Sequence, residues 1–170
     1  MKKIVSGLIL LFVGFAAFCQ SDKKPCSLTE AEEEGHLVRK GEMNYLSGNY
    51  KELRLSIQFQ MIDNNMYVCI GMDLPQGDTI YQDNLAYIQF EDGKECVLTP
   101  DIVRKDKSGK RTECKFLVAE KDEPLFIASV MSGVFLSTKE HPQIDIIDLN
   151  RYTARKFRER FECAYSNLKK

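Results

Sequence analysis

The clearest pattern in this chain is an alternation of apolar and polar side chains between Leu53 and Leu74. Leu, Ile, Phe and Met occupy every second position from Leu53 to Met61, and Arg, Ser and Gln lie between them. A period of two predicts a half-buried strand. Asn64-Asn65 follows and predicts a tight two-residue turn, because asparagine tolerates the positive φ that such a turn needs.

The predicted turn also sets a register for the hairpin. With Asn64-Asn65 as the loop, every pair on the inner face is apolar: Met61 with Val68, Phe59 with Ile70, Ile57 with Met72, and Leu55 with Leu74. A loop longer by one residue would turn the second strand's side chains over, so the apolar pattern favours the shorter loop.

Asp92-Gly93 predicts a second hairpin, because Asp-Gly is among the strongest signals for a short reversal between strands. Its strands span about 85–90 and 94–99. A two-residue loop sets Ile88 opposite Val97 and Tyr87 opposite Leu98. Both faces are then partly apolar, which predicts central strands covered on two sides.

The rest of the chain carries weaker strand signals and two helix signals. A charged loop at 105–112, containing Ser108-Gly109, precedes a predicted strand at 113–120. Pro124 suits the first turn of a short helix at 125–131, which Gly133 would end. Two further strands are predicted at 134–137 and 144–149.

Helices are predicted at both ends of the mature chain. Capping-box spacings beginning at Ser27 predict a helix of about two turns that ends at Gly35. The closing segment, 151–168, has Asn150 as its cap and one apolar stripe. The stripe comprises Phe157, Phe161, Ala164, Tyr165 and Leu168.

Together these elements predict a mainly β (α+β) protein. We expect an antiparallel β-sandwich or open barrel of about seven strands, with the C-terminal amphipathic helix lying across a sheet face or plugging an end. The domain spans 27–170 and follows a disordered lead-in at 20–26. About 150 residues is an ordinary length for one domain.

Residues 1–19 have the pattern of a signal peptide. Lys2 and Lys3 precede an uncharged apolar run from Ile4 to Phe18, which is too short to span a bilayer. Cleavage before Gln20 is expected. The alternative is a lipoprotein acylated at Cys19, although lipoprotein processing favours a small residue where Phe18 stands. The mature chain is thus expected to be periplasmic or extracellular, with no transmembrane segment.

The net charge of the mature chain and the charge of its final helix limit which classes of partner are expected. Removal of the leader leaves 22 basic residues (24 less Lys2 and Lys3) against 25 acidic ones, a net charge of −3. No global bias toward polyanions follows, and export also argues against nucleic acid. The final helix is locally basic. Its flank, with Arg151, Arg155 and Arg158, is a candidate binding surface or pairs internally with the acidic stretch 30–34. The loop at Ser108 is a second candidate surface.

The mature portion holds five cysteines, and an exported chain meets an oxidising compartment. Because five is odd, at least one thiol is unpaired within the chain. Cys26 with Cys163 would join the two ends, and Cys96 with Cys114 is a second candidate pair. Unpaired thiols remain the alternative for both pairs.

The sequence contains few residues in patterns typical of catalysis or of metal binding. His36 and His141 are the only histidines, and neither has a partner at zinc-like spacing. No Gly-x-Ser-x-Gly elbow and no phosphate-cradling glycine loop occurs. The sequence therefore predicts no metal and no cofactor, and it favours a protein that is not an enzyme.

The chain resembles the small β-rich proteins exported to the envelopes of Gram-negative bacteria. The resemblance rests on the leader ending at Cys19-Gln20, the hairpins and the closing helix. It implies an envelope location and carries no functional motif.

Three function classes stay open. The first is a non-catalytic binding or interaction module with a protein or glycan partner in the envelope, which suits a hairpin-rich sheet without a convergent polar motif. The second is a carrier of a small apolar ligand, with a barrel cavity lined by Phe59, Ile70 and Phe90. The third is an enzyme whose site is assembled from the dispersed histidines and cysteines.

Overall fold

The computed structural model describes residues 28–46, 55–74, 79–81, 83–106, 108–139, 144–147 and 150–169. Along these residues lie the following strands and helices: β1 (Thr29–Glu33), β2 (His36–Lys40), β3 (Asn44–Leu46), β4 (Leu55–Ile62), β5 (Asn65–Asp73), β6 (Ala86–Phe90), β7 (Glu95–Leu98), β8 (Pro100–Lys105), β9 (Arg111–Leu117), α1 (Glu123–Ala128), β10 (Met131–Leu136), β11 (Ile144–Ile147) and α2 (Arg151–Leu168).

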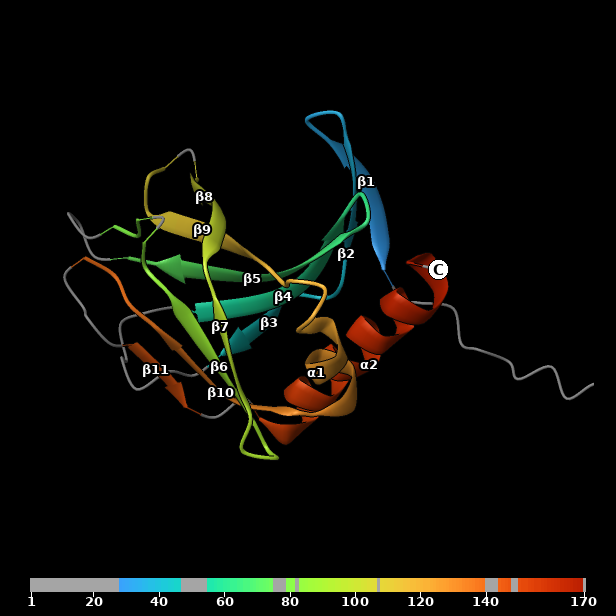
Figure 1. Ribbon diagram of the computed structural model, residues 1–170. Coiled ribbons are helices and arrows are strands. Elements are labelled where there is room, and N and C mark those ends of the chain that lie inside the picture. Colours follow the sequence, from blue (N-terminus) through green and yellow to red (C-terminus); the bar gives the residue numbers. More distant parts are fainter. Residues whose placement is uncertain are drawn as a thin grey trace, which may run out of the picture.

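The strands form two antiparallel sheets (Figure 1). One has seven strands in the order β1-β2-β4-β5-β9-β8, with β3 also paired to β4, and the other has four in the order β11-β10-β6-β7. The predicted mainly β, α+β sandwich is confirmed, and the described strands form no closed barrel. The predicted number of about seven strands was too low, because β1, β2, β3 and β8 were not predicted.

The core lies between the two sheets and both helices. α2 contacts β4 of one sheet and β10 of the other, and it also packs on α1. Its bounds and its Asn150 cap are as predicted, with Asn150 Oδ1 accepting a hydrogen bond from the Tyr152 amide at 3.0 Å. Phe157 and Phe161 are fully buried and meet the Phe59 ring edge-on. The apolar stripe therefore closes the core, as the sequence predicts.

The predicted first helix is wrong. Thr29–Glu33 and His36–Lys40 form a hairpin that turns at Glu34 and Gly35, both with positive φ (55° and 84°). β2 also pairs with β4, where Val38 lies opposite Ile62 and is buried. Backbone pairing with β4 and this burial outweigh the local capping signals, which carry only weak preferences.

The β4–β5 hairpin exists, but its predicted register is wrong by two residues. The loop is Asp63-Asn64, with φ of 53° at Asp63, so that Met61 pairs with Met66 and Phe59 with Val68. A shift of two keeps every side chain on its predicted face. The buried inner face is apolar as expected. The Asp63 carboxylate accepts hydrogen bonds from His36 Nδ1 and the Leu37 amide, and these contacts from β2 favour the earlier turn.

The second hairpin differs by one residue, which changes its faces. Gly93 has a φ of 79° and its amide donates to the Phe90 carbonyl, which closes a three-residue loop. Ile88 therefore pairs with Cys96, both buried, while Tyr87 pairs with Val97. Tyr87 and Val97 are 43% and 51% exposed. The prediction that both faces are covered is therefore wrong, and β7 is an edge strand.

The remaining predicted elements lie close to their predicted bounds: the strands now seen as β9, β10 and β11, and the helix now seen as α1. In the part of the chain that the structure describes, no helix is long and apolar enough to cross a membrane.

Candidate functional site

A groove of about 560 Å³ runs along the outer face of the four-stranded sheet. Tyr87 of β6 and Phe135 of β10 are direct cross-strand neighbours there, on strands that lie side by side (Figure 1). Val97 of β7 pairs with Tyr87 on its other side, so these three residues form a row across β10, β6 and β7. The described lining residues are Asp83, Leu85, Tyr87, Gln89, Glu95, Phe135, Leu136 and Ser137. Tyr87 is 43% exposed and Phe135 is half-buried, so both rings offer part of a large rigid apolar face to a ligand in the groove.

The polar side chains that line or border this groove carry amides, carboxylates and hydroxyls. Gln89 Nε2 donates to Glu95 Oε1 at 2.9 Å, and Asn84 Nδ2 donates to Ser137 Oγ at 3.2 Å. Around the groove the described lining residues include Asp83 and Glu95 and no Lys or Arg. The groove therefore carries negative charge and offers mostly acceptors, which match a ligand rich in hydroxyl donors.

Gly133 of β10 lies beside two side chains of the groove. It lies opposite Gln89 on the neighbouring strand, and the nearest atoms to a Cβ built there belong to Phe135 at 3.5 Å and Gln89 at 3.6 Å. A larger side chain would fill the space between these two. The missing side chain thus keeps the aromatic surface of Phe135 accessible.

The outer face of the seven-stranded sheet is concave and carries both polar and apolar side chains. β1 and β8 stand at opposite ends of the strand order, yet Arg104 of β8 donates to Glu34 at the β1–β2 turn at 2.6 Å. The sheet must therefore curl to bring its ends together. Ser56, Gln60 and Lys115 point to this face and are nearly fully buried.

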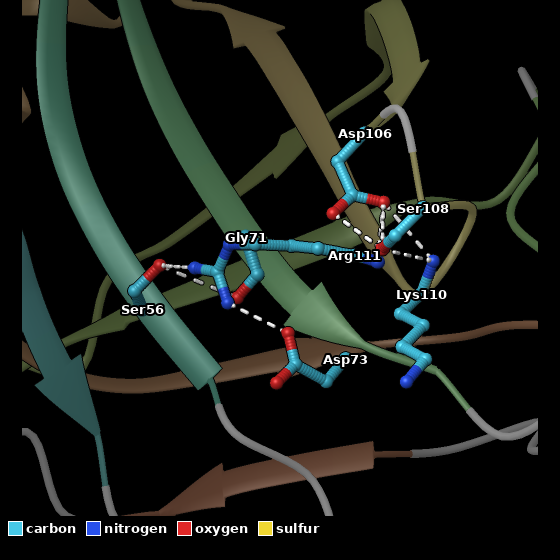
Figure 2. A network of polar contacts seen from close by, with 7 residues as sticks. All are labelled: Ser56, Gly71, Asp73, Asp106, Ser108, Lys110 and Arg111. Carbon is cyan, nitrogen blue, oxygen red and sulfur yellow. Dashed lines mark hydrogen bonds and ion pairs between the residues drawn. The ribbon is translucent and has the colours of Figure 1, made fainter.

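Arg111 organises one end of that face (Figure 2). Its guanidinium donates to Asp73 Oδ1 at 2.9 Å and contacts Ser56 Oγ. The side chain lies over Gly71, where an added Cβ would collide with the guanidinium and come 2.8 Å from Ser56 Oγ. Glycine at this position therefore lets one arginine connect β4, β5 and β9.

Ser108, a predicted binding residue, is held within its own loop (Figure 2). Its Oγ donates to the Asp106 carboxylate at 2.8 Å, and Asp106 Oδ1 accepts the amides of Lys110 and Arg111 at 3.0 and 3.1 Å. These hydrogen bonds, first that from Ser108, hold the pKa of Asp106 below its ordinary value. The arrangement orders the β8–β9 loop, and Ser108 lies away from the aromatic groove.

The basic flank of α2 is paired in part, though not with the acidic stretch predicted. Arg160 donates to Glu42 Oε2 at 2.5 Å, and Lys156 lies 3.9 Å from the same oxygen. Arg151 pairs with Glu91 at 3.2 Å. Glu30, Glu33 and Glu34 instead pair with Arg39, Lys40 and Arg104. The predicted pairing is wrong because residues 29–33 form a strand whose carboxylates pair with cations of the same sheet.

Two other arginines were predicted as binding residues on this helix. Arg155 is exposed, whereas Arg158 is half-buried and its Nε has no hydrogen-bond partner among the described residues. Neither lines the aromatic groove. The structure therefore does not gather the predicted arginines and Ser108 into one site.

The predicted Cys96–Cys114 disulfide is wrong. Both thiols are free and buried, and they lie on strands of different sheets. Burial raises the pKa of Cys96 to about 11 and that of Cys114 to about 12, so both stay protonated at neutral pH. Cys163 is disulfide-bonded. Cys26 lies outside the described residues, so its pairing with Cys163 stays a prediction.

Most residues predicted for the carrier and for the enzyme lie in the described part of the chain. Phe59, Ile70 and Phe90 belong to the buried core, where Phe59 packs on α2 and Phe90 on Phe126. His36 is exposed, and its Nδ1 lies 2.9 Å from Asp63 Oδ2. His141 lies outside the described residues.

Comparisons with known proteins do not connect this chain to a family. No family model, no curated protein and no solved structure matches it. Within the described ranges no group of three or more His, Cys, Asp or Glu side chains gathers as a metal site would require.

Sequence reasoning missed the aromatic groove. Alternation along β6 separates Tyr87 and Gln89 from the inward Ala86, Ile88 and Phe90, and this signal was available. The predicted two-residue loop at Asp92-Gly93 hid it by pairing Tyr87 with an inward leucine. Phe135 gave no signal, because it sits between two other apolar residues.

Proposed function

We propose that this protein is a non-catalytic binding module whose groove on the four-stranded sheet takes a neutral glycan. The observation that carries the proposal is the aromatic pair of exposed Tyr87 and half-buried Phe135, set among Gln89, Glu95 and Asp83, with no Lys or Arg among the described lining residues. Aromatic faces attract the weakly positive C–H groups of a sugar ring, and amide and carboxylate groups bond its hydroxyls.

A glycan suits this groove better than a protein partner. The centres of protein interfaces are depleted in charged residues, and stable ones bury about 800 Å² on each side. Here carboxylates stand beside the aromatic rings, inside a groove rather than on a broad apolar patch. The described lining residues include two carboxylates and no Lys or Arg, which disfavours acidic glycans, so neutral chains are the expected ligands.

Titration calorimetry with defined neutral hexasaccharides tests this function. Maltohexaose, cellohexaose, chitohexaose and xylohexaose serve as probes, and we expect at least one to bind. The variant Tyr87→Ala should weaken that binding about fivefold, because stacking on one aromatic ring contributes roughly 1 kcal/mol. Its folding should change little, since Tyr87 is 43% exposed.

The matched control is Tyr45→Ala, which removes an equally large and more exposed ring from β3 of the other sheet. It should bind as the wild type does. Failure of all four probes to bind, or equal losses in the two variants, would refute the glycan proposal.

We further propose that the protein is exported, as the apolar leader and the resemblance to envelope proteins imply, and that Cys26 pairs with Cys163. The disulfide-bonded state of Cys163 supports an oxidising location. Intact-mass analysis of protein from the envelope should give a chain beginning at Gln20, two hydrogen masses lighter than the reduced form. A mass with an acylated Cys19, or a chain without cleavage, would contradict this proposal.

A further inference from the structure

A small pocket lies on the concave face of the seven-stranded sheet, whereas the aromatic groove lies on the four-stranded sheet. Its volume is about 210 Å³, and residues of the β1–β2 hairpin, β5, β8 and β9 surround it. Val38, Ile62, Tyr67 and Ile102 supply apolar surface, while Lys115 supplies an amine. The pocket therefore joins an apolar wall to a single buried cation.

The Lys115 side chain is unusual because it is only 4% exposed. Buried lysines are rare unless a partner compensates the charge. Among the described residues its nearest partner is Glu113 Oε1 at 3.7 Å, which is longer than a hydrogen bond. The ammonium group thus has unused donors, and it lines the pocket.

The other charges around this pocket are matched in pairs. Glu33 pairs with Lys40, Glu34 with Arg104, and Asp63 with His36. The hydrogen bond from Lys40 holds the pKa of Glu33 below its ordinary value, so this carboxylate stays ionised and paired. Lys115 differs from these cations because its nearest carboxylate among the described residues, that of Glu113, lies 3.7 Å away, beyond hydrogen-bond distance, which leaves its donors open to an incoming anion.

Tyr67 stays neutral beside this cation. Burial, together with the hydrogen bond of its hydroxyl to Asp101 Oδ2 at 3.1 Å, raises the pKa of Tyr67 to about 12. The ring therefore offers the pocket an uncharged apolar face. The Glu113 carboxylate lies 3.7 Å from Lys115 Nζ, and its charge disfavours ligands with more than one negative charge.

We propose that this pocket binds a small monocarboxylate with a compact branched apolar body. The carboxylate accepts charge-assisted hydrogen bonds from Lys115 Nζ, and the apolar body packs on Val38, Ile62 and Ile102. The same chemistry is present in a free short-chain acid and in the C-terminal carboxylate of a peptide.

Amide chemical shifts of the mature protein test the pocket. We expect 3-methylbutanoate to produce saturable shifts at Val38, Ile62, Tyr67 and Ile102. The uncharged isostere 3-methylbutanamide and inorganic phosphate should each bind at least about tenfold more weakly, since a hydrogen bond to a charged group contributes about 1.5–3 kcal/mol. N-acetylvaline distinguishes the two sources: comparable binding indicates a peptide end, and much weaker binding indicates a free acid.

Two pocket variants and one control variant test whether carboxylate binding takes place in this pocket. Lys115→Met keeps the apolar stem and should reduce carboxylate affinity about tenfold, whereas Lys110→Met removes an exposed lysine of the β8–β9 loop and should not. Val38→Phe fills the pocket while keeping the amine, so it should also lose binding, and it serves alone if Lys115→Met fails to fold.

The proposal is wrong if no carboxylate shifts these amides, if the amide and the acid bind equally, or if the pocket variants bind as tightly as Lys110→Met. The pocket lies on a different sheet from Tyr87, so this result is independent of glycan binding.

Discussion

Replacing Phe161 with alanine is expected to lower the free energy of unfolding by about 3–5 kcal/mol. Phe161 is fully buried, and its ring centroid lies 5.3 Å from that of Phe59 and 5.0 Å from that of Phe126. The substitution therefore opens a cavity where α2, α1 and β4 meet. Because Phe126 also contacts Phe90 of β6, the loss reaches both sheets.

Urea unfolding followed by circular dichroism measures this loss. Arg155→Ala is the matched control, because it shortens an exposed side chain on the same helix and should change stability by less than about 0.5 kcal/mol. Should the two variants unfold at the same urea concentration, α2 would not close the core as described.

Replacing Lys169 with methionine is expected to destabilise the protein by about 3 kcal/mol. Glu123, the first residue of α1, has a side chain only 4% exposed, and Lys169 pairs with it from beyond the end of α2. Removing the cation leaves a carboxylate buried without compensation, which costs more than the pair itself contributes. The pair thus couples α1 to the end of the chain.

The double variant Glu123→Gln with Lys169→Met provides the test of mechanism. A neutral amide removes the uncompensated charge, so we expect it to restore much of the stability lost in Lys169→Met alone. The control is Lys110→Met, because the Lys110 side chain is exposed and lies outside any buried ion pair among the described residues. If the double variant is no more stable than Lys169→Met alone, the buried charge is not the cause.

The candidate sites were far less predictable than the fold. Lys115 lies between Cys114 and Phe116, so alternation directs it to the opposite, outer face, where a lysine is ordinarily solvated. Its burial depends on the curl that joins Glu34 to Arg104, residues 70 positions apart. No local pattern carries that information. Likewise Tyr87 and Phe135 become neighbours only through the pairing of β6 with β10.

Two wrong predictions, the register of the β4–β5 hairpin and the helix at the start of the domain, have a shared physical origin. The turn at Asp63-Asn64 gains hydrogen bonds from His36 and Leu37, which belong to another strand. The segment at 29–40 has helical capping signals, but pairing with β4 offers it backbone hydrogen bonds and the burial of Val38. In each case contacts between distant segments exceed local preferences of a few tenths of a kcal/mol to about 1 kcal/mol.

The amino-acid sequence alone determined the elements whose signals are local and repeated. These are α2 with its Asn150 cap, the inner apolar face of β4 and β5, and the α+β class that follows from them. Tertiary structure alone decided the registers, the ion-pair partners of α2, the aromatic row across β6 and β10, and the burial of Lys115. The reason is physical: periodicity assigns a side chain to a face, whereas what meets that face depends on strands distant in sequence.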